Sequence, residues 1–149
     1  MTAQQKLDPA TEAMLKSQKA GPSPDHIRKV FEDYGACMSR GDTDGILTLF
    51  APDAYIEDPV GSGKQVGHAA LRKFYQGGFD AMGGPLEMKL DGAVRVAGSN
   101  AAAAYIVKTL NHTEPFRVET LDVMTFNEQG LITSMLAYWG PSNISPLEK

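Results

Sequence analysis

The residue whose chemistry is least expected at its position is Asp122. Residues 116–126 alternate between the two faces of an expected strand. With a period of two, four residues share a face with Asp122: Val118, Thr120, Met124 and Phe126. An ionised carboxylate among apolar side chains is costly, so Asp122 must either find a partner or keep its proton and become a hydrogen-bond donor. The alternative is that the opposite face, which carries Leu121 and Val123, packs inward and leaves Asp122 in solvent.

Two other residues, Tyr34 and Asp58, are of types that donate hydrogen bonds or accept protons. Tyr34 lies on the apolar side of an expected helix, where the simplest interpretation is a core tyrosine with its hydroxyl on a backbone carbonyl. Asp58 ends a short expected strand immediately before Pro59, where a turn-forming aspartate is common. Taken alone, each residue is more often structural, so neither defines a site by itself.

Other kinds of chemistry find little support in the sequence. The three histidines are isolated and have no metal-ligand spacing, and no Gly-x-Ser-x-Gly motif places a nucleophile. The segment Gly61-Ser62-Gly63-Lys64 resembles a fragment of a phosphate loop, but it lacks the preceding glycine spacing and does not lead directly into a helix. We therefore expect no metal and no cofactor.

Three helices are predicted in the first half of the chain. Ser23-Pro24-Asp25 is a typical helix start, and the helix that follows it ends near Gly41. The apolar stripe of this helix consists of six residues: Ile27, Val30, Phe31, Tyr34, Cys37 and Met38. A second, short helix begins near residue 43, and a third spans about residues 68–82.

Strands dominate the chain after the third predicted helix, and one short strand precedes that helix. A short strand at residues 54–58 is ended by Pro59, because proline supplies no ladder donor. Five further strands are predicted: Leu86–Leu90, Ala93–Val96, Ala102–Leu110, Phe116–Phe126 and Leu131–Trp139. The last of them is expected to place five residues on one face: Leu131, Thr133, Met135, Ala137 and Trp139. This order predicts an α+β fold in which helices cover one face of an antiparallel sheet.

The composition predicts one domain and narrows the possible partners. The chain has 149 residues, a net charge of −4 and no basic run, so we expect neither nucleic acid nor an anionic membrane as a partner. No apolar run approaches the ~20 residues of a membrane-spanning helix. Residues 1–22 are expected to form an arm that is flexible or holds a short helix around Met14, residues 23–143 the folded domain, and residues 144–149 a C-terminal tail. A single cysteine, Cys37, and the lack of a visible secretory signal predict a cytoplasmic protein.

One set of residues occurs in a recognisable order. It consists of Tyr34, Asp58-Pro59, Gly67 with Phe74-Tyr75, Leu121-Asp122-Val123-Met124-Thr125-Phe126, and Glu128-x-Gly130 with Met135-x-Ala137-Tyr138-Trp139. This set, which spans roughly residues 24–143, resembles bacterial ketosteroid isomerase, also called steroid Δ5-isomerase. The resemblance implies the NTF2-like, SnoaL-like superfamily, in which three helices pack on a curved, mixed or antiparallel sheet around a deep apolar pocket.

The resemblance implies a role for each matched residue. Asp58 stands at the position of the general base, which moves a proton from carbon 4 to carbon 6 of a 3-oxo-Δ5-steroid, while Tyr34 and Asp122 stand at the oxyanion hole. Tyr75 is implied to support Tyr34 through a hydroxyl network, and Trp139 to lie close to the base. The implied substrate pocket includes Met135, Met124, Phe126, Val118 and Phe74. Ketosteroid isomerases are themselves the usual example of a carboxylic acid that an apolar site keeps neutral.

Partners and alternatives also follow from the resemblance. We expect a small apolar steroid as substrate and a homodimer formed across the outer sheet face, where Glu119, Leu121 and Val123 are compatible with an interface. Two alternatives stay open: a dehydratase or cyclase of the same fold that acts on a polyketide-like substrate, and a non-catalytic module that binds apolar ligands. Such dehydratases and cyclases usually rely on a His–Asp pair, and no histidine here falls on an evident cavity face. Some relatives carry a further tyrosine where this chain has Phe50, so the hydroxyl network is expected to be shorter.

Overall fold

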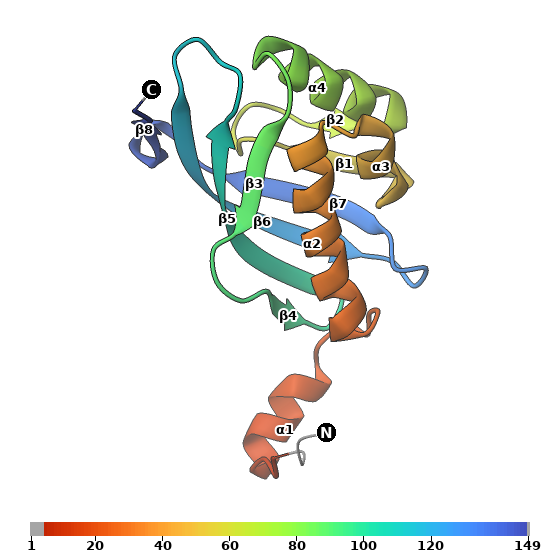
Figure 1. Cartoon of the computed structure of the whole chain (residues 1–149). Coiled ribbons are helices and arrows are strands. Elements are labelled where there is room, and N and C mark those ends of the chain that lie inside the picture. Colours follow the sequence, from red (N-terminus) through yellow and green to blue (C-terminus); the bar gives the residue numbers. More distant parts are fainter. Residues whose placement is uncertain (1–4, 149) are drawn as a thin grey trace.

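One curved sheet and the helices that lie against one of its faces form the frame of the molecule (Figure 1). The computed structural model describes residues 5–148. The helices are α1 (Pro9–Lys16), α2 (Pro24–Arg40), α3 (Thr43–Thr48), α4 (His68–Ala81) and the 3₁₀ turn η1 (Pro141–Asn143). The strands are β1 (Phe50–Glu57), β2 (Gln65–Val66), β3 (Leu86–Leu90), β4 (Arg95–Ala97), β5 (Asn100–Thr109), β6 (Phe116–Phe126), β7 (Ile132–Tyr138) and β8 (Ile144–Pro146). This arrangement confirms the predicted α+β class.

The longest helix, α2, forms where the sequence predicts it. Ser23 caps its first turn, because its side-chain oxygen accepts a hydrogen bond from the backbone N–H of His26 at 3.1 Å. Gly41 ends the helix in the left-handed conformation, with a φ of 66°, where other residues are strained. Five residues of the predicted stripe are buried: Ile27, Val30, Phe31, Tyr34 and Cys37. The sixth, Met38, is partly buried against the same core.

The two ends of the described chain differ in how they relate to this frame. α1 extends away from the body of the molecule, and none of its residues is buried (Figure 1). α1 contains Met14, so the short helix expected around this residue is present. Near the other end, β8 pairs with β6 inside the segment that the sequence suggested as a tail. None of the helices in residues 5–148 is long and apolar enough to cross a membrane.

The pairing of β1 with β7 is where the sheet departs from its prediction. The strand order is β2-β1-β7-β6-β5-β3, with β4 paired to β5 and β8 to β6. Every neighbouring pair is antiparallel except β1 and β7, which are parallel. The sheet is therefore mixed, as the family resemblance allowed, whereas the strand pattern alone had suggested an antiparallel sheet. Turn residues indicate which consecutive strands form hairpins, but they carry no signal for two strands separated by about half the chain.

The inward face of β6 confirms the predicted alternation, whereas β7 breaks it at one point. All five inward residues of β6 are buried: Val118, Thr120, Asp122, Met124 and Phe126. On β7, Ile132 is buried and Thr133 is not, opposite to the expectation. Phe126 pairs with Ile132 and Thr125 with Ser134, so Thr133 is the extra residue of a bulge. The bulge resets the alternation, and Met135 and Ala137 are buried as predicted.

Candidate active site

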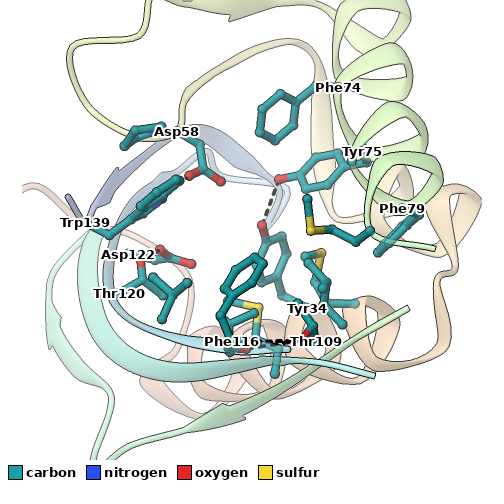
Figure 2. A pocket seen from close by; sticks show the side chains of 18 residues that line it. Tyr34, Asp58, Phe74, Tyr75, Phe79, Thr109, Phe116, Thr120, Asp122 and Trp139 are labelled. Atoms are coloured by element: carbon teal, nitrogen blue, oxygen red, sulfur yellow. Dashed lines mark hydrogen bonds between the residues drawn. The ribbon is translucent and has the colours of Figure 1, made fainter. Parts of the chain in front are cut away.

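A cavity of about 350 Å³ lies between α2, α4 and the sheet. This volume falls in the range of roughly 300–1,000 Å³ that is typical of small-molecule sites. Its wall is mostly apolar, and seven polar or amphipathic side chains line it: Tyr34, Asp58, Tyr75, Thr109, Thr120, Asp122 and Trp139. Figure 2 shows that Asp58, Trp139, Thr120 and Asp122 project from the sheet side, and that the hydroxyls of Tyr34 and Tyr75 meet opposite them. The structure therefore brings together all five residues that the resemblance implied for catalysis.

Asp58 and Trp139 meet because β1 and β7 run in parallel. Glu57 pairs with Leu136, so the two strands end on the same side of the sheet. The residues that follow them include Asp58 after β1 and Trp139 after β7. The indole N–H of Trp139 donates a hydrogen bond to Asp58 Oδ1 at 2.7 Å. Burial raises the pKa of the partly buried Asp58 carboxyl above its ordinary value of 3.8, and the hydrogen bond from Trp139 opposes that rise. The indole thus favours the carboxylate form, which accepts protons.

Asp122 lies in the middle of β6, between two alanines. Its direct neighbours across the strands are Ala103 on β5 and Ala137 on β7, both buried. Asp122 is 2% exposed, and the hydroxyl of Thr120 donates a hydrogen bond to its Oδ1 atom at 3.1 Å. Burial holds the pKa of Asp122 well above its ordinary value, the negative charge of Asp58 raises it further, and the bond from Thr120 lowers it. The protonated form, a hydrogen-bond donor, is therefore favoured at this position.

Tyr34 and Tyr75 form a pair of buried hydroxyls. Their oxygens are 2.9 Å apart, and either hydroxyl can act as the donor. Tyr34 is 1% exposed, and burial raises the pKa of its hydroxyl well above the ordinary value. Burial likewise raises the pKa of Tyr75. Both tyrosines therefore stay neutral and available as donors.

Two aromatic residues fix the place of Tyr34 on α2. The hydroxyl of Tyr105 donates a hydrogen bond of 2.7 Å to the backbone carbonyl of Phe31, one turn before Tyr34, and so ties the helix to β5. The ring of Phe50 lies edge-on to that of Tyr34, with centroids 6.5 Å apart. Because Phe50 has no hydroxyl, it extends no hydrogen bond to this pair. The hydroxyl network of Tyr34 therefore includes Tyr75 but not residue 50, and it is shorter, as expected.

Three of the five residues suggested for the pocket wall do not line it. Phe74 and Val118 line the cavity as expected. Met124, Phe126 and Met135 instead lie in the hydrophobic core, and this corrects the expectation. The inward face of β6 borders the cavity only as far as Asp122. Beyond that residue it packs under α2, where the rings of Phe31 and Phe126 have centroids 6.5 Å apart.

Several residues that line the cavity were not predicted from the sequence as part of the pocket. They are Met38, Pro59, Gly78, Phe79, Met82, Leu86, Met88, Val107, Thr109, Phe116 and Thr120. A signal existed for Phe116 and Thr120, because both alternate in phase with Asp122 on β6. Met38 also had a signal, because it follows Tyr34 by about one turn on the apolar stripe of α2, whereas none existed for Met82 and Met88.

Comparison with known proteins places this geometry in a class. Residues 31–135 match the family described as SnoaL-like domain. The structure is similar to that of SalBIII, an epoxide hydrolase/cyclase-like enzyme with a role in pyran ring formation in the polyether salinomycin. The TM-score is 0.73 at 25% sequence identity, over 83% of this chain and 97% of that one. The fold is therefore the NTF2-like fold, with a SnoaL-like domain.

Two relatives of known activity are similar to this chain in sequence. The chain is 38% identical over 118 residues to the steroid Delta-isomerase of Nocardioides simplex, covering 79% of this chain and 93% of that protein. The chain belongs to the bacterial ketosteroid isomerase family and is an isomerase. It is also 28% identical over 158 residues to the epoxide hydrolase LasB of Streptomyces lasalocidi, covering 89% of this chain but only 54% of that protein.

Proposed function

We propose that the protein converts 3-oxo-Δ5-steroids to 3-oxo-Δ4-steroids by moving one proton within the substrate. The observation that carries the proposal is the set of three groups in one apolar cavity: a carboxylate held by an indole, Asp58, and two neutral donors, Tyr34 and Asp122. This set supplies a base and a place for negative charge on oxygen. The similarity to the steroid Delta-isomerase of Nocardioides simplex gives the substrate class.

In the first step of this proposal, Asp58 removes the proton from carbon 4 of the substrate. The C–H electron pair then forms the new double bond to carbon 3, and the carbonyl electrons move onto the C3 oxygen. The resulting dienolate carries its negative charge mainly on that oxygen. In the second step the protonated Asp58 returns its proton to carbon 6, and the conjugated ketone forms. One carboxyl performs both transfers, so the enzyme ends in its starting state.

Tyr34 and Asp122 stabilise the dienolate by donating hydrogen bonds to its oxygen. Both groups are neutral because burial disfavours their charged forms, so they add no negative charge beside the developing oxyanion. When Tyr34 donates to the substrate, Tyr75 donates to Tyr34 across the 2.9 Å contact. Fixed donors in a water-poor site are usually the largest single contribution to such reactions.

A second candidate function is suggested by the similarity to the epoxide hydrolase LasB and to the epoxide hydrolase/cyclase-like enzyme SalBIII. An acid and a base in one apolar cavity also suit the opening of an epoxide by water or by a substrate hydroxyl. There, the neutral Asp122 would protonate the epoxide oxygen while Asp58 takes a proton from the attacking oxygen. The higher identity and fuller coverage of the steroid Delta-isomerase favour the isomerase reaction.

The deciding experiment mixes purified protein with a 3-oxo-Δ5-steroid and records the ultraviolet band of the conjugated enone. We expect the band to grow with multiple turnovers, and deuterium at carbon 4 to slow its growth if proton removal limits the rate. A parallel incubation with an apolar epoxide, followed by mass spectrometry, tests the second function. Epoxide consumption without steroid turnover would reject the isomerase proposal.

We also propose that the enzyme is a homodimer that associates through the outer face of the sheet. Leu121 and Tyr138 are direct cross-strand partners, and they are 42% and 46% exposed. The next pair along the same face, Val123 and Leu136, is also apolar. An exposed apolar patch of this kind is typical of an interaction surface. We expect Leu121→Lys to convert a dimer to a monomer in light scattering, whereas a monomeric wild type would reject the proposal.

A further inference from the structure

We propose that Thr120 is a positioning residue that holds the carboxyl group of Asp122 with its Oδ2 atom toward the substrate oxygen. The inference rests on the proposed function, because it assigns a task to a neighbour of one oxyanion donor. No role follows for Thr120 from the family resemblance, which matched other residues on this strand.

The first support is geometric. Thr120 and Asp122 are two residues apart on β6, so both side chains point to the same face, and both line the cavity. Thr120 is buried, and its hydroxyl lies 3.1 Å from Asp122 Oδ1. Within residues 5–148, this is the one side-chain hydrogen bond that Asp122 makes.

The second support is that, among residues 5–148, no other side chain holds the Asp122 carboxyl by a hydrogen bond. The flanking residues across the strands, Ala103 and Ala137, have no polar atoms in their side chains. Without the Thr120 hydroxyl, rotation about the bond between Cβ and the carboxyl carbon would be limited by packing alone. A terminal torsion of this kind is broad and roughly two-fold, so either oxygen of a free carboxyl can face the cavity.

The third support is the state of the second oxygen. In the described part of the chain, no fully buried side-chain nitrogen or oxygen lacks a hydrogen-bond partner. Asp122 Oδ2 has no such partner among the described residues, so it reaches the open cavity. A protonated carboxyl has one donor oxygen and one acceptor oxygen. With Oδ1 accepting from Thr120, the proton belongs on Oδ2, where the substrate arrives.

The hydrogen bond from Thr120 also changes how strongly Asp122 donates its own proton. Hydrogen bonds in a chain polarise one another, so donation from Thr120 to Oδ1 makes the Oδ2 hydroxyl a stronger donor. The titratable groups that surround Asp122 come from four elements: Asp58 after β1, Tyr34 on α2, Tyr75 on α4 and Tyr105 on β5. Of these, Asp58 raises the pKa of Asp122 through its charge when it is ionised, whereas the hydrogen bond from Thr120 lowers that pKa.

The test compares three variants of the full chain. Thr120→Val removes the hydroxyl at nearly constant volume, and Thr120→Ser keeps it. Thr125→Val makes the same change on the same strand but on its outer face, away from the cavity. The two readouts are kcat and KM for a 3-oxo-Δ5-steroid, and the pH titration of the Asp122 carboxyl in protein labelled with carboxyl-¹³C aspartate.

We expect Thr120→Val to lower kcat by about 3- to 10-fold, the scale of one hydrogen bond, with KM little changed. The Asp122 titration should move to higher pH in the same variant. Thr120→Ser should restore both properties, and Thr125→Val should change neither. If Thr120→Val does not fold, Thr120→Ala takes its place under the same two readouts.

Two results would overturn the proposal: wild-type kcat and an unmoved Asp122 titration in Thr120→Val, or a serine variant as impaired as the valine variant. A failure of the proposed function looks different. In that case the wild type does not turn over the steroid, while the ¹³C titration still reports whether Thr120 acts on Asp122.

Discussion

The two carboxyl groups of the cavity occupy different kinds of place in the sheet. Asp58 lies just past the end of β1, is partly buried, and accepts a hydrogen bond from the Trp139 indole. Asp122 lies in the middle of β6 and is 2% exposed, with alanines on both sides. Burial raises the pKa of both carboxyls, but it raises that of Asp122 further.

This difference explains how one kind of side chain can serve in opposite protonation states. A strand end leaves room for a charged group and its donor, whereas the middle of a buried strand favours the uncharged form. The backbone position, more than the residue type, therefore supports the proposed roles of Asp58 as base and Asp122 as donor. Replacing each aspartate by the same residue is the direct way to break the comparison.

The largest effect is expected from Asp58→Asn. The amide has nearly the same shape but cannot accept the substrate proton, so kcat should fall by about 10²- to 10⁴-fold. Initial rates of enone absorbance measure this loss. Asp53→Asn is the matched control, because Asp53 lies on β1, the strand that precedes Asp58, and is exposed. A rate near wild type in Asp58→Asn would remove Asp58 from the mechanism.

Substitution of Asp122 should have the next largest effect and should depend on what replaces it. Asp122→Ala removes the donor and should lower kcat by about 10²- to 10³-fold. Asp122→Asn keeps a donating N–H, so its loss should be about 10-fold or less. The same steady-state assay compares the two variants. If asparagine at 122 is as damaging as at 58, the ionised form of Asp122 is the active one.

A smaller effect is expected from Tyr75→Phe. The change removes the hydrogen bond that Tyr75 shares with Tyr34 and leaves the ring in place. One neutral hydrogen bond corresponds to about 2- to 10-fold in kcat. Tyr55→Phe serves as the control, since Tyr55 lies on β1 outside the cavity. A loss as large as that of Asp122→Ala would mean that Tyr75 contacts the substrate itself.

The last prediction concerns stability rather than rate. In the unfolded chain Asp122 titrates near pH ~3.9, and in the folded protein its pKa is higher. Between these values the folded state binds more protons, so this residue's contribution to stability is complete at low pH and is lost as the pH rises through the folded pKa.

Asp122→Asn cannot lose a proton and lacks this dependence. Measured by urea denaturation, its free energy of unfolding relative to wild type should therefore increase from about pH 4 to about pH 7. A difference that stays constant over this interval would show that Asp122 is already ionised in the folded wild type.

The sequence could predict those parts of the site that depend on one element at a time. The alternation of β6 placed Asp122 on the inward face, and the apolar stripe of α2 placed Tyr34 in the core. Both patterns are local, so they are visible in a single chain. The same patterns could not show that the two residues face one cavity.

The parts that could not be predicted from the pattern depend on distant pairing. Asp58 reads as a turn residue until β1 and β7 are known to be parallel, and only the family resemblance pointed to Trp139 beside it. The bulge at Thr133 shifted the alternation of β7 in a way that no residue type signals. Likewise, Met124 and Phe126 share the face of Asp122 but lie where helix packing replaces the cavity.

The parallel pair has a consequence for synthesis. Trp139 follows Asp58 by 81 positions. At about 5–20 residues per second, the ribosome adds this stretch in roughly 4–16 s, during which Asp58 has no indole to hold it. A nascent chain that stops short of the last long strand lacks that contact, whatever helices it has already formed. This contact is thus formed late, and a truncated product would carry Asp58, the proposed base, without the indole that holds it.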